Sequence, residues 1–285
     1  MHREAQRAAG AIAAALILTA TGCSSSSHLA PPKIGAAATY HLAGFRPVTR
    51  VHPGKKFVVA FRIDQPSGGT LVDYKRGPGP HTGIHLIIVR EDLSVIIHRH
   101  PRVGPDGTVR QPIVLPAPGP YRVLVDAYPK LTGIRSNFQL FATLRASGPY
   151  MPQPLPPPTS ADRVGGYTVT LRGAGHLKAI DPMYVTATVV DAAGRPVKFV
   201  PWYGALAHAI FFRKGSLDYF HTHVCAPGAS GCTSLLGGAK VTGTSATPGK
   251  LSVGVLVPVA GTWRLFLQCL VDGQVLTAPF TLLVR

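Results

Sequence analysis

An internal repeat constrains the fold of this chain more than any other feature of its sequence. The segment IHLIIVREDLSVIIHRHP aligns position by position with AHAIFFRKGSLDYFHTHV later in the chain. The flanking segments match as well, FVVAFRID with YVTATVVD and GPYRVLVDA with GTWRLFLQC. Because these matches recur in the same order, the sequence predicts two copies of one domain.

A proline-rich segment separates the two copies. It reads SGPYMPQPLPPPT over Ser147–Thr159, a composition that favours an extended and semi-rigid chain. The sequence therefore predicts a first domain over residues 39–147, a linker over 148–163 and a second domain over 164–285. Each domain is long enough to bury a hydrophobic core of its own.

Short runs of alternating apolar and polar residues indicate β-strands in both copies. Only 14% of the residues are charged, and the chain holds 31 glycines and 27 prolines, as is typical of strands joined by tight turns. The predicted fold class is all-β, with two tandem antiparallel β-sandwiches of immunoglobulin or cupredoxin type and a barrel as the alternative. The strands are expected near residues 56–64, 70–75, 84–90, 94–100, 109–115, 120–128 and 136–145, and near 167–172, 183–191, 196–203, 207–213, 216–223, 250–257, 262–270 and 274–284.

Each copy carries the pattern His-x12-His-x-His. The six histidines are His85, His98, His100, His208, His221 and His223. If two-residue turns at Glu91-Asp92 and Lys214-Gly215 close the two hairpins, the first histidine of each copy faces the second across the strand pair. The third then lies on the same face, two residues further on. This face is the more apolar one, and we expect it to point inwards at the mouth of each sandwich.

Three imidazoles on one face can share a divalent metal ion. Neutral imidazole is suited to Zn(II), Cu(II) or Ni(II), and three nitrogens leave a fourth coordination position open. Burial of three imidazoles is costly without a partner, so the pattern predicts a metal site in each copy. The alternative is a structural hydrogen-bonding cluster that the duplication carried into both copies. His81 and Cys269 are further candidate ligands.

The motifs of both copies resemble a known group of proteins. GxHLxxVREDLS, HxHP and PGPYRV in the first copy, with YGALxH, DYFHTH and GTWRLFLQ in the second, are similar to secreted actinobacterial proteins with duplicated domains. The domain is in turn similar to periplasmic β-sandwiches of the CopC and YtkA type. The resemblance spans most of residues 40–285 and implies copper or heavy-metal binding in the export compartment. The second copy departs from it, with Val224-Cys225 in place of a proline and Cys269 in place of an aromatic residue.

The first 23 residues are predicted to be a lipoprotein signal peptide. Arg3 and Arg7 precede an apolar run that ends in ATGC at Cys23, and this ending resembles a bacterial lipobox. Cys23 is then the acylated N-terminus, followed by a flexible tether over residues 24–38. Plain cleavage near the alanine-rich run is the alternative.

Export sets the expected location and partners. The acyl anchor would hold the protein in the membrane, at the outer face of the bacterial cell membrane. The formal net charge of +17 is scattered along the chain, without a basic helix or an aromatic-basic RNA motif. We therefore expect that the protein does not bind nucleic acid. Anionic lipid or cell-wall polymer is a possible partner, and no specific protein partner is inferred.

The remaining cysteines and the lack of catalytic motifs complete the prediction. Cys225 and Cys232 lie in a Gly/Pro-rich loop of an exported protein, which favours a disulfide between them. Cys269 is left over and is expected to be a buried thiol, with a soft metal ligand as the alternative. The sequence contains no G-x-S-x-G motif, no H-E-x-x-H motif and no phosphate-binding loop. We therefore expect that the protein is not an enzyme.

Two functional hypotheses follow from these features. The first is a surface lipoprotein that binds copper, or else zinc, through a three-histidine hairpin site in each domain. The second is a non-catalytic structural or interaction lipoprotein of the envelope whose histidines are packing elements.

Overall fold

The computed structural model describes residues 39–285, apart from residues 78, 131–136, 230–233, 237–238 and 242. The predicted signal peptide, its lipidated Cys23 and the tether lie outside the described residues. The described chain is all-β apart from one turn of 3-10 helix, η1 (Ala174–His176), which confirms the predicted fold class. No helix of the described chain has the length and apolar character needed to cross a membrane.

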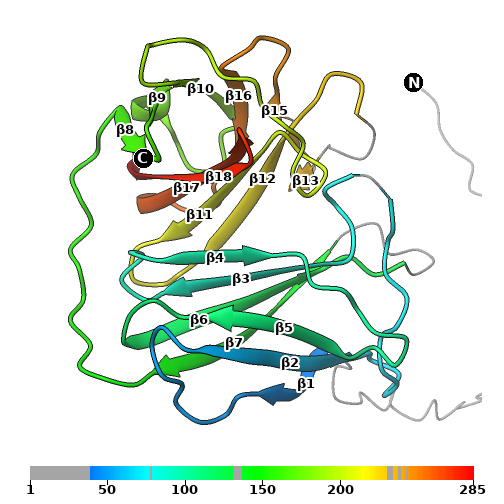
Figure 1. The fold of residues 1–285 in the computed structure, drawn as a ribbon. Coiled ribbons are helices and arrows are strands. Elements are labelled where there is room, and N and C mark those ends of the chain that lie inside the picture. Colours follow the sequence, from blue (N-terminus) through cyan, green and yellow to red (C-terminus); the bar gives the residue numbers. More distant parts are fainter. Residues whose placement is uncertain (1–38, 78, 131–136, 230–233, 237–238, 242) are drawn as a thin grey trace, which may run out of the picture. The chain divides into compact units, whose positions relative to one another are not determined.

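The first half of the chain forms two antiparallel sheets that enclose one core (Figure 1). Phe61 and Ile63 of one sheet and Leu86, Ile88 and Val123 of the other are buried in it. These residues alternate with side chains of the opposite face, as the period of two in a strand requires. The sheets are β1 (His41–Arg46), β2 (Lys56–Asp64) and β5 (Val109–Val114) in the order β1-β2-β5, and β4 (Ile96–Arg99), β3 (Ile84–Arg90), β6 (Gly119–Ala127) and β7 (Phe138–Ala146) in the order β4-β3-β6-β7.

The second half forms one nine-stranded sheet around a core of its own. Trp263, Phe211 and Phe280 are among the largest side chains buried there. In spatial order the strands are β18 (Gln274–Val284), β17 (Gly261–Val271), β11 (Ala207–Arg213), β12 (Tyr219–Cys225), β15 (Gly243–Thr244), β16 (Lys250–Val255), β10 (Met183–Val190), β9 (Tyr167–Arg172) and β8 (Ala161–Val164), and a separate hairpin pairs β13 (Ser234–Leu236) with β14 (Ala239–Val241). The two ends of the sheet, β8 and β18, contact each other.

Two of the predicted strands do not form. The segments 70–75 and 196–203 take part in isolated bridges only, for instance between Val190 and Pro196 and between Val200 and Leu270. A proline lacks the N–H that a strand donates to its neighbour, so Pro196 and Pro201 break the second segment into single contacts. Strands β1, β8, β13, β14 and β15 lie outside the predicted ranges.

The β3–β4 hairpin of the first half lies beside the β11–β12 hairpin of the second (Figure 1). A third apolar cluster joins them, made of Ile87, Val89, Leu93 and Leu124 from the first half and Ile210, Phe212, Leu217 and Phe266 from the second. Every residue of β3 is buried, because one face of the strand covers the first core while the other packs on the second half. The two hairpins that carry the histidines are therefore in direct contact.

Candidate metal centre

The two histidine hairpins have longer turns than predicted. Arg90 N–H donates to Val95 O and Arg213 N–H to Asp218 O, so each turn spans four residues rather than two. The predicted pairing of His85 with His98 and of His208 with His221 is therefore wrong by two residues. Because the error is an even number of residues, the histidines keep their common face.

The observed register brings the first histidine of a copy opposite the third. His208 pairs with His223 across the ladder, and His98 pairs with Ile87. In the first copy, the rings of His85 and His100 stack with their centroids 3.9 Å apart. The shift thus exchanges the cross-strand partners but still brings the imidazoles of each hairpin together.

The face that carries the histidines points away from each half's own core. In β3, Leu86 and Ile88 belong to the first core, while His85 and Ile87 lie on the other face. In β11, Phe211 belongs to the second core, while His208 lies opposite to it. The prediction of a site at the mouth of each sandwich is therefore wrong, and the histidines lie between the two halves.

All six predicted histidines meet in one cluster. The ring centroids of His98 and His208, which come from different halves, are 4.9 Å apart, and those of His85 and His221 are 5.3 Å apart. Three groups of three have ligand nitrogens within 4.8 Å of one another: His85, His98 and His100; His85, His221 and His223; and His98, His208 and His221. Two of these groups combine both halves. Over the described residues, the second copy's own three histidines are not such a group.

Burial keeps these imidazoles neutral. Removal from water lowers the pKa of His85, His98, His221 and His223 well below the ordinary value of 6.5, and neighbouring imidazoles lower it further. The same burial lowers the pKa of His208 to about 4. The pKa of His100, which is only partly buried, is lowered for the same reasons. A neutral imidazole carries one N–H and one lone pair, so the tautomer of each ring determines which nitrogen can bind a cation.

Backbone acceptors determine the tautomers of His85 and His208. His85 Nε2 lies 2.7 Å from Pro80 O, and His208 Nε2 lies 3.0 Å from Trp202 O. A carbonyl oxygen only accepts, so both Nε2 atoms must carry the hydrogen and both Nδ1 atoms carry the lone pair. His221 Nε2 lies 3.2 Å from His208 Nδ1 and therefore donates to it, which leaves the lone pair of His221 on its Nδ1.

Three buried ring nitrogens remain without a hydrogen-bond partner among the described residues. They are His85 Nδ1, His221 Nδ1 and His223 Nε2. The first two carry lone pairs by the tautomers just derived. His223 Nδ1 lies 3.1 Å from His81 Nε2, and when His223 donates this hydrogen bond its Nε2 carries a lone pair as well. These three residues form one of the three convergent groups.

The nitrogens of His98 are, by contrast, both satisfied. Gln268 Nε2 donates to Thr277 Oγ1 at 3.0 Å, so Gln268 Oε1 faces His98 Nδ1 at 3.1 Å and accepts from it. His98 Nε2 then accepts from His100 Nε2 at 3.1 Å. In the first copy's own group, His85, His98 and His100, the hydrogen bond between His98 and His100 occupies one lone pair, so this group has fewer vacant lone pairs than the group of His85, His221 and His223.

The other residues considered as metal ligands or disulfide partners lie elsewhere or at the edge of the cluster. The Cys269 side chain belongs to the second core, and burial raises the pKa of this thiol to about 12, so it is not aimed at the histidines. Cys225 is disulfide-bonded, and its predicted partner Cys232 lies outside the described residues. His81, at the edge of the cluster, contacts His223 and Tyr128.

Several residues around the cluster were not predicted. Tyr203 stacks on His100 with the ring centroids 4.0 Å apart, and Trp202 packs edge-on against His98 and His208. Gln268 could have been found, because it aligns with Asp126 and both interrupt an apolar strand with a polar residue.

Asp126 forms a second polar contact between the halves. It is buried, and it accepts hydrogen bonds from Tyr219 of the second half at 3.3 Å and from Tyr128 at 3.4 Å, and another from Asn137. Burial raises the pKa of Asp126 to about 7, against the opposing effect of these donors. Asp126 and Gln268 thus occupy equivalent strand positions and each bonds to the opposite half.

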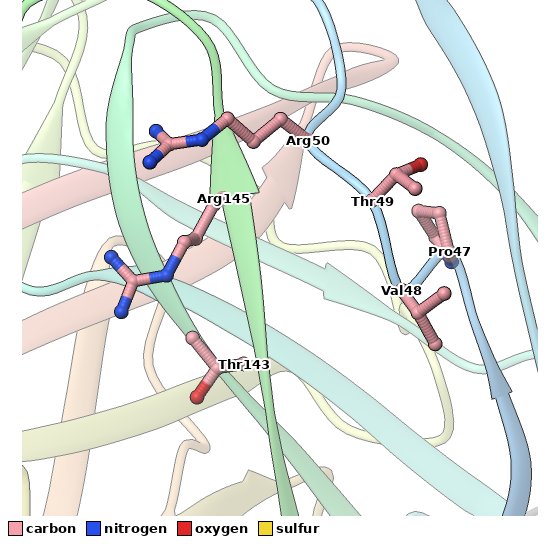
Figure 2. A pocket seen from close by; sticks show the side chains of 6 residues that line it. All are labelled: Pro47, Val48, Thr49, Arg50, Thr143 and Arg145. Carbon is pink, nitrogen blue, oxygen red and sulfur yellow. The ribbon is translucent and has the colours of Figure 1, made fainter.

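A shallow pocket lies on the first half, away from the histidines. Figure 2 shows its lining residues, which are Pro47, Val48, Thr49, Arg50, Thr143 and Arg145. Its volume of about 200 Å³ is below the 300–1,000 Å³ typical of small-molecule sites. The two exposed arginines make it positively charged.

Comparison with known proteins gives one family match and several distant structural ones. A family model described as "Domain of unknown function (DUF8832)" matches residues 162–285. The search of curated proteins yields no match. Among solved structures, a Salmonella alpha-2-macroglobulin is similar at 13% identity and a TM-score of 0.28, covering 88% of this chain and 15% of that one. A tandem-repeat region of a large adhesion protein has 10% identity and a TM-score of 0.26, covering 87% and 48%. Invasin, a bacterial integrin-binding protein, has 14% identity and a TM-score of 0.23, covering 86% and 38%. The chain thus spans less than half the length of each.

Proposed function

We propose that this protein binds a divalent metal ion through His85, His221 and His223, at a site to which both halves contribute. One observation carries the proposal: three buried imidazole nitrogens of one convergent group lack a partner among the described residues. A buried polar atom without a partner costs about 1–3 kcal/mol, and three such atoms in one group of neighbouring histidines are rare in folded proteins. A bound cation would satisfy all three at once.

The surroundings of the three ligands support this assignment. A metal-bound histidine commonly donates its other ring N–H to a fixed acceptor, which orients the ring. Such a contact exists for each ligand: Pro80 O for His85, His208 for His221 and His81 for His223. The rings would need no new hydrogen bonds to present their lone pairs.

The donor set favours copper, with zinc as the second choice. Neutral imidazole suits both ions, and Cu(II) binds such ligands more tightly than other divalent first-row metals. Three nitrogens leave a fourth position for water. The resemblance to CopC and YtkA proteins supports the same choice. We propose no catalysis, because Glu91, which could have served as a base, lies in the hairpin turn, outside the three convergent groups.

The proposed setting is the outer face of the bacterial cell membrane. Acylation of Cys23 would anchor the protein, and the high positive charge would favour anionic lipid or cell-wall polymer nearby. Arg50 and Arg145 of the shallow pocket are the first candidates for such a contact. In this setting the protein would hold copper that reaches the envelope.

Titration of the purified mature protein with Cu(II) and Zn(II) tests the metal site. We expect binding tighter than micromolar for the wild type, and at least a tenfold loss in His85→Ala and His223→Ala. His52→Ala, which alters an exposed histidine of the first half, is the matched control and should bind as the wild type does. Lack of binding by the wild type, or full binding by both ligand variants, would overturn the proposal and favour a structural cluster.

Thermal unfolding provides a second measurement that does not depend on the variants. A ligand that binds the folded state alone stabilises it by about 2.7 kcal/mol at one hundred times its Kd. Addition of metal should therefore raise the Tm of the wild type and of His52→Ala by more than it raises the Tm of His223→Ala. An equal rise in all three proteins would mean that the metal binds elsewhere.

A further inference from the structure

We infer that the histidine cluster binds a second metal ion through His98, His208 and His221, with His221 bridging the two ions. This inference rests on the proposed function, since it adds an ion beside the one held by His85, His221 and His223. His221 belongs to both convergent groups. The result would be a binuclear centre in which each half of the chain contributes to both ions.

The lone pairs of this second group can be assigned. His208 directs Nε2–H to Trp202 O, so its Nδ1 is the free donor atom for a metal. His98 directs Nδ1–H to Gln268 Oε1, so its Nε2 has this role. In both rings an oxygen atom accepts the hydrogen bond from one N–H and leaves the other nitrogen for a metal. This arrangement is expected around the ligands of a metal site.

The spacing between two of these nitrogens already fits a shared ion. His208 Nδ1 and His221 Nε2 are 3.2 Å apart. Two imidazole nitrogens on a tetrahedral ion, each with a bond of about 2.0–2.1 Å, lie about 3.3 Å apart. The spacing of these two nitrogens therefore already suits an ion in place of the hydrogen bond between His208 and His221.

His221 is the one histidine that can serve two ions. Each pair of the convergent groups shares a residue, His85, His98 or His221, so two three-histidine ions require a shared ring. The second nitrogen of His85 is occupied by Pro80 O and that of His98 by Gln268 Oε1. The second nitrogen of His221 instead faces His208, which is itself a potential ligand.

Binding of the second ion releases one proton from the protein. The first ion takes the lone pair of His221 Nδ1, and no proton is displaced. When the second ion binds, the His221 Nε2–H bond breaks, its proton leaves to solvent and the Nε2–metal bond forms. His221 then bridges as an imidazolate, whose single negative charge offsets part of the charge of the two cations. His98 Nε2 becomes available when the hydrogen bond from His100 is given up, and His100 is only partly buried.

Copper stoichiometry and electron paramagnetic resonance test the bridge in the full mature protein. We expect two Cu(II) ions per chain, with an EPR signal that grows with the first equivalent and falls with the second because the imidazolate couples the two spins. The second equivalent should release one more proton than the first, as measured in a weakly buffered solution. His208→Ala should bind one ion with an undiminished signal, and the exposed-site control His176→Ala should behave as the wild type.

The outcomes separate this inference from the proposed function. One ion per chain, lost in His223→Ala, would overturn the second site and leave the first intact. Two ions whose EPR signals simply add would overturn the bridge. Lack of any bound copper would overturn both proposals together.

Discussion

Acidification should destabilise this protein steeply, because six histidines are held neutral between its two halves. The folded-state pKa of each is lowered, whereas the unfolded value is about 6.5. Below pH 6.5 the unfolded chain therefore binds protons that the folded protein excludes. Stability is present above pH 6.5 and is lost as the pH falls towards the folded-state values.

The size of this loss follows from the number of histidines. Each one costs about 1.4 kcal/mol per pH unit once the pH is below the unfolded pKa. From pH 7 to pH 5.5, six histidines that remain neutral in the folded state remove about 7 kcal/mol. Asp126 acts in the opposite direction, because its pKa is raised to about 7 in the folded state, and its protonation returns about 2 kcal/mol over the same interval. The net loss of about 5 kcal/mol is comparable to the whole stability of many domains.

Urea unfolding of the metal-free protein at pH 7.0, 6.5, 6.0 and 5.5 measures this loss. We expect the free energy of unfolding to fall by about 5 kcal/mol over the series, and this fall to be smaller by about 1.2 kcal/mol in a His98→Gln variant. His52→Ala, at an exposed position, should retain the wild-type slope. A stability that does not change between pH 7.0 and 5.5 would refute the assignment of neutral buried imidazoles.

Three further predictions concern the interface and its surroundings. Phe212→Ala removes a fully buried ring from the cluster between the halves and should lower the free energy of unfolding by about 3–5 kcal/mol in urea titrations; a loss below about 1 kcal/mol would contradict the packing described. Tyr219→Phe removes one donor to Asp126 and should cost about 0.5–1.5 kcal/mol while raising the pKa of Asp126, which carboxyl NMR chemical shifts can follow; an unchanged pKa would argue against the contact. Cys269→Ala should leave copper affinity unchanged in the same titration as the wild type, since the thiol faces the second core; a tenfold weaker affinity would show that it is a ligand.

The duplication made the hairpins and their histidines predictable, but not the pairing within them. The sequence favours two-residue turns because four-residue turns at these places need Leu93 and Leu217 at positive φ. Such a conformation is uncommon for leucine. Both leucines are buried in the cluster between the halves, so tertiary packing stabilises this conformation. In the first turn, Asp92 also accepts hydrogen bonds from the backbone and side chain of Ser94. A local pattern contains no information on such packing.

The location of the cluster was hidden for a related reason. Alternation in a strand identifies the residues that share a face, but it identifies the inner face only when the other face is polar. The strand IHLIIVR is apolar on both faces, and every residue in it is buried. That continuous apolar run was the available signal that a second body covers the sheet.

The contact between the halves uses different polar residues at equivalent positions of the two copies. If the halves were identical, the polar residues at positions 126 and 268 would make the same bond to the opposite half. Gln268 instead fixes the tautomer of His98, whereas Asp126 accepts a hydrogen bond from Tyr219. A carboxylate beside His98 would favour a charged imidazolium, which cannot bind a cation. The amide of Gln268 therefore keeps the proposed ligand His98 neutral. The carboxylate of Asp126 instead lies beside the hydroxyl group of Tyr219.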